Sequence, residues 1–155
     1  MKVFITGISG LLGSTMARFL INQGHEVVGI DNMIGGVDGN VPELATYIKG
    51  DILDVELMKE SMQGCEVVFH TAALPYEGLS VFSPMVTATS IVSGTIATAS
   101  AAIHNKIRLF INCSSMARYG EQTPPFTENM QPAPVDPYGL AKVNAEQHLK
   151  ILNNL

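Results

Sequence analysis

Three side chains in the last third of the chain are of the types that move a proton on and off a hydroxyl group. Tyr138 and Lys142 lie four residues apart in the segment YGLAK, so on a helix they share one face, one turn apart. A lysine ammonium beside a tyrosine hydroxyl favours the phenolate, which can accept a proton. Ser115, in NCSSMARYG, supplies a hydroxyl that can hydrogen-bond an oxygen that becomes a carbonyl. This Tyr/Lys spacing also occurs by chance in many chains, so its meaning depends on the elements around it.

Three glycines at the start of the chain predict a binding site for an anion. Gly7, Gly10 and Gly13 follow the apolar run KVFIT in the segment TGISGLLG. The first permits a tight turn, the second lets a ligand approach the backbone, and the third lets a helix pack on the strand. The helix expected from about Leu11 points its unpaired N–H groups at the loop, which favours a pyrophosphate and hence a dinucleotide. A purely structural strand-to-helix turn is the alternative.

The end of the second expected strand favours NAD over NADP as that dinucleotide. The run EVVGID ends at Asp31, about 20 residues beyond the glycines, where a carboxylate can bind both ribose hydroxyls. The sequence has no lysine or arginine between Arg18 and Lys49 to bind a 2′-phosphate, which Asp31 would also repel. The alternative for Asp31 is a solvated carboxylate in a turn.

Two further stretches predict walls of the cofactor site. In GDILD, Asp51 follows the third expected strand and can accept a hydrogen bond from the adenine amino group. In FHTAALP, the small side chains of Ala72 and Ala73 leave room for a flat ring system. His70, in the same stretch, has apolar neighbours and is interpreted as a packed strand residue rather than a catalytic one.

The order of elements that must position these residues predicts an α/β fold with a doubly wound parallel sheet. Short apolar runs typical of strands buried on both faces alternate with helical stretches. The carboxyl ends of parallel strands meet at one edge, where ligands bind. Residues 115–136 contain four prolines and are expected to form a loop, and Asp136-Pro137 predicts a helix start. The expected strands are 2–6, 26–31, 47–51, 67–73 and 108–115, and the expected helices are 11–23, a short element near 40–46, 54–63, 87–105 and 137–153.

Composition and charge exclude several classes of function. The 155 residues suffice for about one domain, and 46% hydrophobic residues indicate a globular protein. A net charge of −5 without a basic cluster argues against nucleic-acid binding. Cys65 and Cys113 lack metal-ligand spacing and are expected to be reduced thiols in a cytoplasmic protein.

No membrane segment is expected. Lys2 is followed by only a few apolar residues before the glycines, so the N-terminus does not resemble a signal peptide. The stretch from Gly78 to Asn105 has no charged residue, but nine of its residues are Ser or Thr and Pro84 and Gly94 interrupt it. A buried helix of small residues fits this stretch better than a membrane span.

Taken in order, these motifs resemble the N-terminal part of the extended short-chain dehydrogenase/reductase family, in its NAD-dependent epimerase/dehydratase branch. The chain is most similar to the UDP-glucose 4-epimerase group. TGISGLLG matches the family pattern TGxxGxxG, and HTAA, the SS-to-YG segment and YGLAK match in order and spacing. The resemblance covers nearly the whole chain and implies one NAD-binding domain of the Rossmann type over residues 1–155.

The resemblance implies a tightly held NAD that is reduced only transiently, and a nucleotide sugar, most simply a UDP-sugar, as substrate. Tyr138 would take the proton of a sugar hydroxyl, Lys142 would hold the nicotinamide ribose and favour the phenolate, and Ser115 would steady the sugar oxygen. The keto-sugar would turn over and be reduced on its other face. The implied cofactor-binding residues are Gly7, Gly10, Leu11, Leu12, Gly13, Asp31, Asn32, Asp51, Ile52, Ala72, Ala73, Tyr138 and Lys142.

Local departures from the family pattern bear on the reaction. Met116 and Ala117 follow Ser115, so the acid that sugar dehydratases need in this segment is missing and epimerisation is favoured. Ile91 stands where the family usually has an asparagine, with Gly94 and Thr95 kept. A keto-sugar oxidoreductase and a catalytically silent NAD-binding module are the alternatives.

The sequence is about half as long as extended members of the family. We expect that the last strands and the substrate-binding lobe are absent, that the 108–115 strand is an uncovered edge, and that this chain alone has little activity. A truncated product, half of a split enzyme and a genuine short protein all remain open. The uncharged helix 87–105 and the helix 138–153 are expected to form a homodimer; burial under other segments of the same chain is the alternative.

Overall fold

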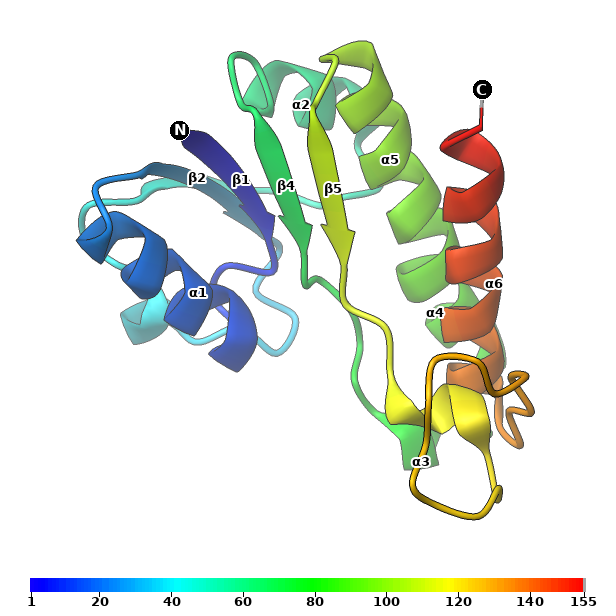
Figure 1. Ribbon diagram of the computed structural model, residues 1–155. Helices are drawn as coiled ribbons and strands as arrows, with labels where there is room; N and C mark the ends of the chain where they lie inside the picture. Colours follow the sequence, from blue (N-terminus) through cyan, green and yellow to red (C-terminus); the bar gives the residue numbers. More distant parts are fainter. Residues whose placement is uncertain (155) are drawn as a thin grey trace. The chain divides into compact units, whose positions relative to one another are not determined.

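A computed structural model, which describes residues 1–154, contains a single five-stranded parallel sheet (Figure 1). The strand order is β3-β2-β1-β4-β5, so the sheet grows outward from β1 first on one side and then on the other. The point where the direction reverses, between β1 and β4, is where such sheets bind ligands. The predicted doubly wound α/β fold is therefore confirmed. The strands are Lys2–Thr6, Glu26–Asp31, Thr46–Lys49, Val67–His70 and Leu109–Asn112 for β1 to β5.

The chain divides into two compact units. The sheet unit comprises Met1–Ala73 and Ala97–Cys113, and the helical unit comprises Leu74–Ile96 and the chain from Ser114 onward. All five strands and the glycine segment belong to the sheet unit. Ser115, Tyr138 and Lys142 belong to the helical unit.

Alternation along the strands of the sheet unit supplies one apolar core for each face. Val3 and Ile5 point to the face covered by α1 (Leu11–Asn22), where Ala17 and Leu20 pack against them. The face of β1 that carries Phe4 has a separate core.

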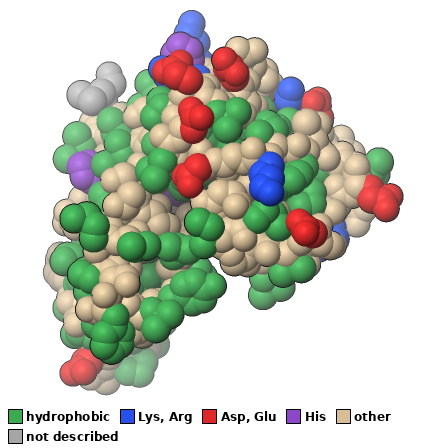
Figure 2. All heavy atoms as spheres, turned by 180° about the vertical axis from the view of Figure 1, so that it is seen from behind, with side chains coloured by type: hydrophobic (Ala, Val, Ile, Leu, Met, Phe, Trp, Pro, Cys, Tyr) green, Lys and Arg blue, Asp and Glu red, His purple; other side chains and the backbone are tan. Residues whose placement is uncertain are grey.

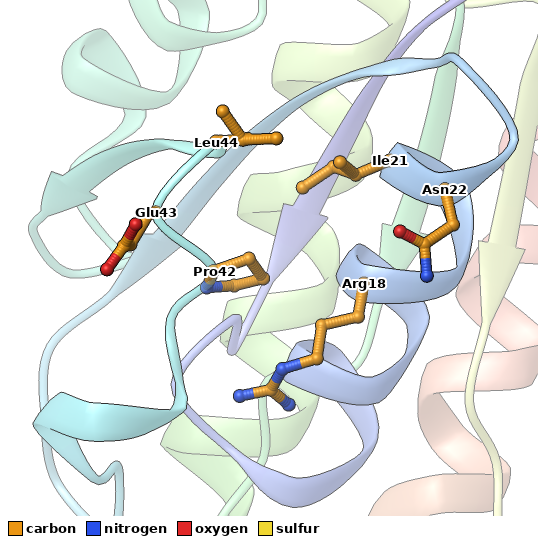
Figure 3. Close-up of a pocket in the computed structure, with 6 residues that line it drawn as sticks. All are labelled: Arg18, Ile21, Asn22, Pro42, Glu43 and Leu44. Atoms are coloured by element: carbon orange, nitrogen blue, oxygen red, sulfur yellow. The ribbon is translucent and has the colours of Figure 1, made fainter.

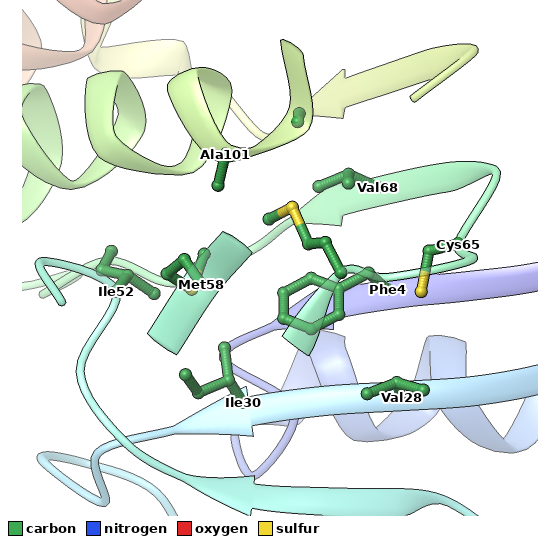
Figure 4. Packing of buried hydrophobic residues seen from close by; sticks show 10 residues of the cluster. Phe4, Val28, Ile30, Ile52, Met58, Cys65, Val68 and Ala101 are labelled. Carbon is green, nitrogen blue, oxygen red and sulfur yellow. The ribbon is translucent and has the colours of Figure 1, made fainter. Parts of the chain in front are cut away.

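That second core lies between the sheet, α2 (Val55–Ser61) and the end of α5 (Gly94–His104). Figure 4 shows Met58 of α2 and Ala101 of α5 directed toward the sheet, where Phe4 lies, and all three are fully buried. Burial of one such large side chain stabilises the fold by about 2 kcal/mol. Both cores hold the ends of β1 and β2, and thus the glycine turn, in place.

One continuous helix runs from Pro84 to His104, built from α4 (Pro84–Ala88), a π-helical turn (Thr89–Ser93) and α5. It begins three residues earlier than predicted. It is long and apolar enough to cross a membrane, with a mean hydropathy of 1.4, but half of that window is buried inside the protein, as in a core helix. Ile91 is buried within the π-helical turn, and its carbonyl accepts a 2.6 Å hydrogen bond from the Thr95 hydroxyl.

The helical unit is organised around α6 (Pro137–Leu152). The predicted start is confirmed: the carboxylate of Asp136 accepts a 2.8 Å hydrogen bond from the Gly139 N–H, and Pro137 occupies the first turn. The short helix α3 (Glu77–Ser80) packs beside α6, and the Tyr138 N–H donates to the Ser80 hydroxyl at 3.3 Å.

Several short elements differ from the prediction. The helix expected near 40–46 is instead one 3-10 turn, η1 (Asp38–Asn40), and the loop expected at 115–136 contains a second, η3 (Met116–Tyr119). Helix α3 was not expected. Single turns carry no apolar periodicity, so the sequence pattern cannot locate them. The strands β3, β4 and β5 end earlier than expected, at Lys49, His70 and Asn112, although the next N–H group of each still donates to the neighbouring strand.

Candidate functional site

The glycine turn joins β1 to α1 with no room for side chains at two of its three glycines. Gly7 has a φ of +71°, and a Cβ there would lie 2.9 Å from the backbone of Ala72. A Cβ on Gly13 would overlap the Gly7 carbonyl oxygen. At Gly10 the nearest atom to an added Cβ is the Gly7 oxygen at 3.3 Å, and the rest of its surroundings are open. The backbone at Gly10 is therefore accessible to a ligand.

The N-terminus of α1 is open to an anion. The first helical hydrogen bond joins the Ser14 N–H to the Gly10 carbonyl at 3.0 Å, so the N–H groups of Leu11, Leu12 and Gly13 have no acceptor within the helix. No side chain caps this end, and no acidic residue lies in its first turn. The Leu11 and Leu12 side chains are 84% and 51% exposed. A phosphate group fits this end because it supplies both the acceptors and the negative charge.

Asp31 lies beside the glycine turn and is not a solvated carboxylate. It is 8% exposed, and one carboxylate oxygen accepts a 2.9 Å hydrogen bond from the Ser9 N–H. The other oxygen accepts from the Met33 N–H at 2.8 Å. The predicted alternative of a solvated turn residue is therefore wrong. The two N–H groups fix the carboxylate and leave further lone pairs for ribose hydroxyls.

A second polar pair lies at the same edge of the sheet. The Asn32 amide donates to one carboxylate oxygen of Asp51 at 2.9 Å, and the Leu53 N–H donates to the other at 2.9 Å. Asp51 is half-buried and keeps acceptor capacity for an amino group. Ile52, which the resemblance placed at the cofactor, packs with the core beneath α2.

The end of β4 forms the neighbouring part of this edge. Ala72 and Ala73 are half-buried, and Ala72 lies against Gly7. His70 is 3% exposed, its Nδ1 lies 2.8 Å from the Thr6 hydroxyl, and its ring contacts Phe110. The interpretation of His70 as a packed strand residue is confirmed.

In the helical unit, Tyr138 and Lys142 share one face of α6, as their spacing predicts. The Nζ of Lys142 lies 5.8 Å from the centre of the Tyr138 ring, and the two residues are 7% and 8% exposed. The structure thus holds the two side chains together within the protein, with the Lys142 ammonium over the Tyr138 ring.

Ser115 begins the turn η3, which packs against the first turn of α6. Its hydroxyl accepts a 3.2 Å hydrogen bond from the Ala117 N–H. A Cβ on Gly139 would lie 2.6 Å from the Ala117 carbonyl oxygen, so η3 and α6 are in close contact at this point. The structure thus packs the turn that follows Ser115 against the first turn of α6, which carries Tyr138.

Sequence reasoning missed a charged network behind these residues. Arg118 of η3 forms an ion pair with Glu146 of α6 at 3.0 Å, and the Ser114 hydroxyl donates to the same carboxylate. No sequence pattern indicates this pair, because Arg118 and Glu146 lie on different elements.

The structure also has an open groove of about 290 Å³ between α1 and the segment Pro42–Leu44 (Figure 3). It contains none of the predicted site residues. In the figure the Arg18 side chain extends along this groove from α1, facing the segment that carries Pro42. The lining residues are Arg18, Ile21, Asn22, Pro42, Glu43 and Leu44.

Comparison with known proteins finds relatives along nearly the whole chain. The sequence matches the NAD dependent epimerase/dehydratase family over residues 3–154. The UDP-glucose 4-epimerase of Streptomyces lividans is 34% identical over 146 residues, covering 92% of this chain and 44% of that protein. The UDP-glucose 4-epimerase of Mycolicibacterium smegmatis is 34% identical over 165 residues, covering 100% of this chain and 52% of its own length.

Solved structures give the same result. The UDP-glucose 4-epimerase of Thermotoga maritima, crystallised with UDP-glucose, superposes with a TM-score of 0.95 at 31% identity, covering 99% of this chain and 52% of its own. The enzyme of Brucella ovis, in complex with NAD, has a TM-score of 0.93 at 33% identity, covering 97% and 47%.

The chain spans about half the length of the curated relatives it matches. Its glycine turn and Asp31 have the arrangement expected for NAD, which is the cofactor of the family. By the match over nearly all of its residues, the chain belongs to the NAD-dependent epimerase/dehydratase family.

Proposed function

We propose that this chain is the NAD-binding part of a nucleotide-sugar 4-epimerase that acts on a UDP-sugar. The observation that carries the proposal is the buried pair of Tyr138 and Lys142 on one face of α6, with the Ser115 turn packed beside it. UDP-glucose 4-epimerases that match nearly the whole chain support the choice of substrate class.

The residues of the sheet unit fit NAD. The N–H groups of Leu11, Leu12 and Gly13 would bind the pyrophosphate, Asp31 the adenosine ribose and Asp51 the adenine amino group. The accessible backbone at Gly10 and the uncapped helix end support this assignment, because a merely structural turn requires neither. Lys142 would hold the nicotinamide ribose.

Each residue of the helical unit has a distinct role in the proposed reaction. Tyr138, as phenolate, takes the proton from the hydroxyl of the sugar carbon that is oxidised, and returns it when the carbonyl is reduced. Lys142 keeps Tyr138 in the phenolate form, and Ser115 donates a hydrogen bond to the sugar oxygen. Bound NAD would supply the acceptor for the hydride of that carbon, and epimerisation requires that the hydride return to the opposite face of the keto-sugar. Met116 and Ala117 offer no acid to expel water, which favours epimerisation over dehydration.

We also propose that the chain forms a homodimer through the helices 87–105 and 138–153. Hydrophobic side chains gather on the surface at the lower left of Figure 2. In the segment just before the helix 87–105, Phe82 and Met85 are 82% and 77% exposed and would extend this interface. On α6, Leu140 and Ile151 are more than half exposed.

Because Cys65 and Cys113 are both free, a reducing compartment such as the cytoplasm suits the protein.

The first test is the melting temperature of the purified chain with NAD, with NADP and with neither. A ligand that binds only the folded protein raises this temperature, and we expect a rise with NAD alone. No shift with NAD would contradict the cofactor assignment.

The second test is conversion of UDP-galactose to UDP-glucose by this chain. Tyr138→Phe should remove any turnover and leave the NAD shift unchanged, because the phenol hydroxyl is the proposed base. Turnover that survives this substitution would refute the catalytic role. Accumulation of NADH with the substrate would instead indicate an oxidoreductase.

A further inference from the structure

The carbonyl of Ser9, inside the glycine turn, accepts two hydrogen bonds from the segment that follows β2. We name this segment, residues Met33–Asn40, the strap. The Val37 N–H donates to the Ser9 carbonyl at 3.1 Å, and the side-chain amide of Asn40 donates to it at 3.0 Å. The N–H of Ser9 donates to Asp31. Both polar groups of the Ser9 backbone are therefore fixed, on one side by the strap and on the other by β2.

These bonds bear on where α1 begins. Four residues after Ser9 comes Gly13, whose N–H would bond to the Ser9 carbonyl if the helix were one residue longer. The strap donors already occupy both lone pairs of that carbonyl. Gly10 keeps an extended backbone (φ −77°, ψ 169°) next to the carbonyl that the strap holds. The helix therefore begins with the bond from Ser14 to Gly10, and the Gly13 N–H has no acceptor within the helix.

Asn40 has contacts on two sides of the strap. Its backbone carbonyl accepts a 2.6 Å hydrogen bond from the Arg18 guanidinium on α1, while its amide bonds to Ser9. Between these ends the strap lies close to the turn, since a Cβ on Gly36 would be 2.9 Å from the Ser9 Cβ and 3.0 Å from the Asp31 carboxylate. Ser9 itself is fully buried.

We propose that Asn40 is a positioning residue of the dinucleotide site. Its side-chain amide fixes the Ser9 carbonyl and so keeps the Gly13 N–H, together with those of Leu11 and Leu12, directed at the bound pyrophosphate. Asn40 acts through the backbone of the glycine turn and does not itself contact the ligand. This inference rests on the proposed function, because the bound group is the pyrophosphate of NAD.

The test is titration calorimetry of the whole chain with NAD, at a temperature where circular dichroism shows each variant to be folded. Asn40→Ala should weaken NAD binding roughly 3- to 10-fold, the factor expected for one hydrogen bond. Asn22→Ala is the matched control: the Asn22 side chain is exposed at the end of α1 and makes no hydrogen bond with the described residues, so the affinity of this variant should equal that of the parent chain. Asn40→Gln keeps the donor and should recover part of the loss.

A purely structural role for Asn40 predicts a different pattern. The melting temperature without ligand would fall, but the dissociation constant of the folded variant would not change, and this result overturns the inference. If Asn40→Ala does not fold, the same titration is made with Asn40→Asp, whose side chain has the same shape but no N–H donor. High salt then screens the charge that this substitution adds.

An amide NMR spectrum gives a readout that does not depend on variants. Addition of NAD to the parent chain should shift the Gly13 amide resonance strongly, and a shift confined to residues elsewhere in the turn counts against the inference. A parent chain that binds no NAD at all refutes the proposed function and the inference with it. Binding that Asn40→Ala leaves intact refutes the inference alone.

Discussion

The guanidinium Nη2 of Arg118 lies 3.0 Å from the carboxylate Oε2 of Glu146, with only 15% and 17% of the two side chains exposed. This ion pair connects η3, which begins next to Ser115, to the helix that carries Tyr138 and Lys142. The Arg118 guanidinium also donates to the Tyr119 hydroxyl at 3.0 Å. The ion pair therefore couples the proposed catalytic hydroxyl of Ser115 to the proposed base through the framework of the helical unit.

Glu146→Ala should destabilise the protein by about 2–3 kcal/mol, because it leaves the Arg118 guanidinium largely buried without a counter-charge. The measurement is the urea unfolding midpoint of the variant against the parent chain. The control is Glu56→Ala, which breaks the exposed pair between Glu56 and Lys59 at 2.7 Å and should cost less than about 0.5 kcal/mol. If the two substitutions lower the unfolding free energy equally, burial does not make the ion pair between Arg118 and Glu146 more stabilising than an exposed pair.

Gly13→Ala should lower the unfolding free energy by about 2 kcal/mol or more, because the added Cβ overlaps the Gly7 carbonyl and backbone atoms cannot move aside cheaply. Gly78→Ala makes the same chemical change in α3, where no atom lies within 4 Å, and should be neutral or slightly stabilising. Thermal unfolding of both variants checks the prediction. A Gly13→Ala variant as stable as the parent chain would contradict the close packing of α1 on the glycine turn.

Asp31→Asn should both destabilise the chain and reduce its preference for NAD over NADP. The carboxylate accepts from the N–H groups of Ser9 and Met33 with different oxygens, and an amide can serve only one of them. The N–H left without an acceptor costs about 1–3 kcal/mol. Loss of the negative charge also removes the repulsion of a 2′-phosphate. Unfolding in urea tests the first effect, and titration with each dinucleotide tests the second; an unchanged ratio of the two affinities would separate Asp31 from cofactor choice.

Alkaline pH should destabilise the sheet unit through Cys65. Burial raises the pKa of this thiol from 9.0 to about 11. Because the folded protein holds the thiol neutral while the unfolded chain ionises first, this contribution to stability is complete below pH 9 and is lost as the pH rises toward 11. The unfolding free energy of the parent chain should therefore fall more steeply across this interval than that of Cys65→Ala. Parallel curves for the two proteins would rule out the effect.

The sequence pattern predicts the elements best where several apolar residues act together. The bounds of β1 and β2 agree with the prediction because both strands are apolar runs closed by a glycine turn or a charged residue. The start of α6 agrees because Asp136 and Pro137 are helix-start residues by their own chemistry. The glycine turn agrees as well, because the backbone at Gly7 and Gly13 leaves no room for a side chain and the sequence therefore shows glycine there.

The remaining parts of the site depend on backbone groups and on contacts between distant residues. Asn40 bonds to a main-chain carbonyl at Ser9, and a carbonyl is present at every residue, so no residue type marks the partner. Arg118 and Glu146 are ordinary surface residues by composition, and only the fold buries them together. The resemblance places Ile52 at the cofactor together with Asp51, and the fold packs its side chain into the core beneath α2, which no local pattern indicates.

The strand order has a consequence for how the protein folds during synthesis. The central strand β1 is made first, but in the sheet Thr6 pairs with His70, which lies 64 residues further along the chain. Until β4, the strand that contains His70, has left the ribosome, β1 can pair only with β2. The other edge of β1 stays unpaired during this time. Such distant parallel pairing slows folding and leaves the nascent chain open to association with other chains. We therefore expect this topology to make the yield of folded protein depend on chaperones, without lowering the stability of the folded state.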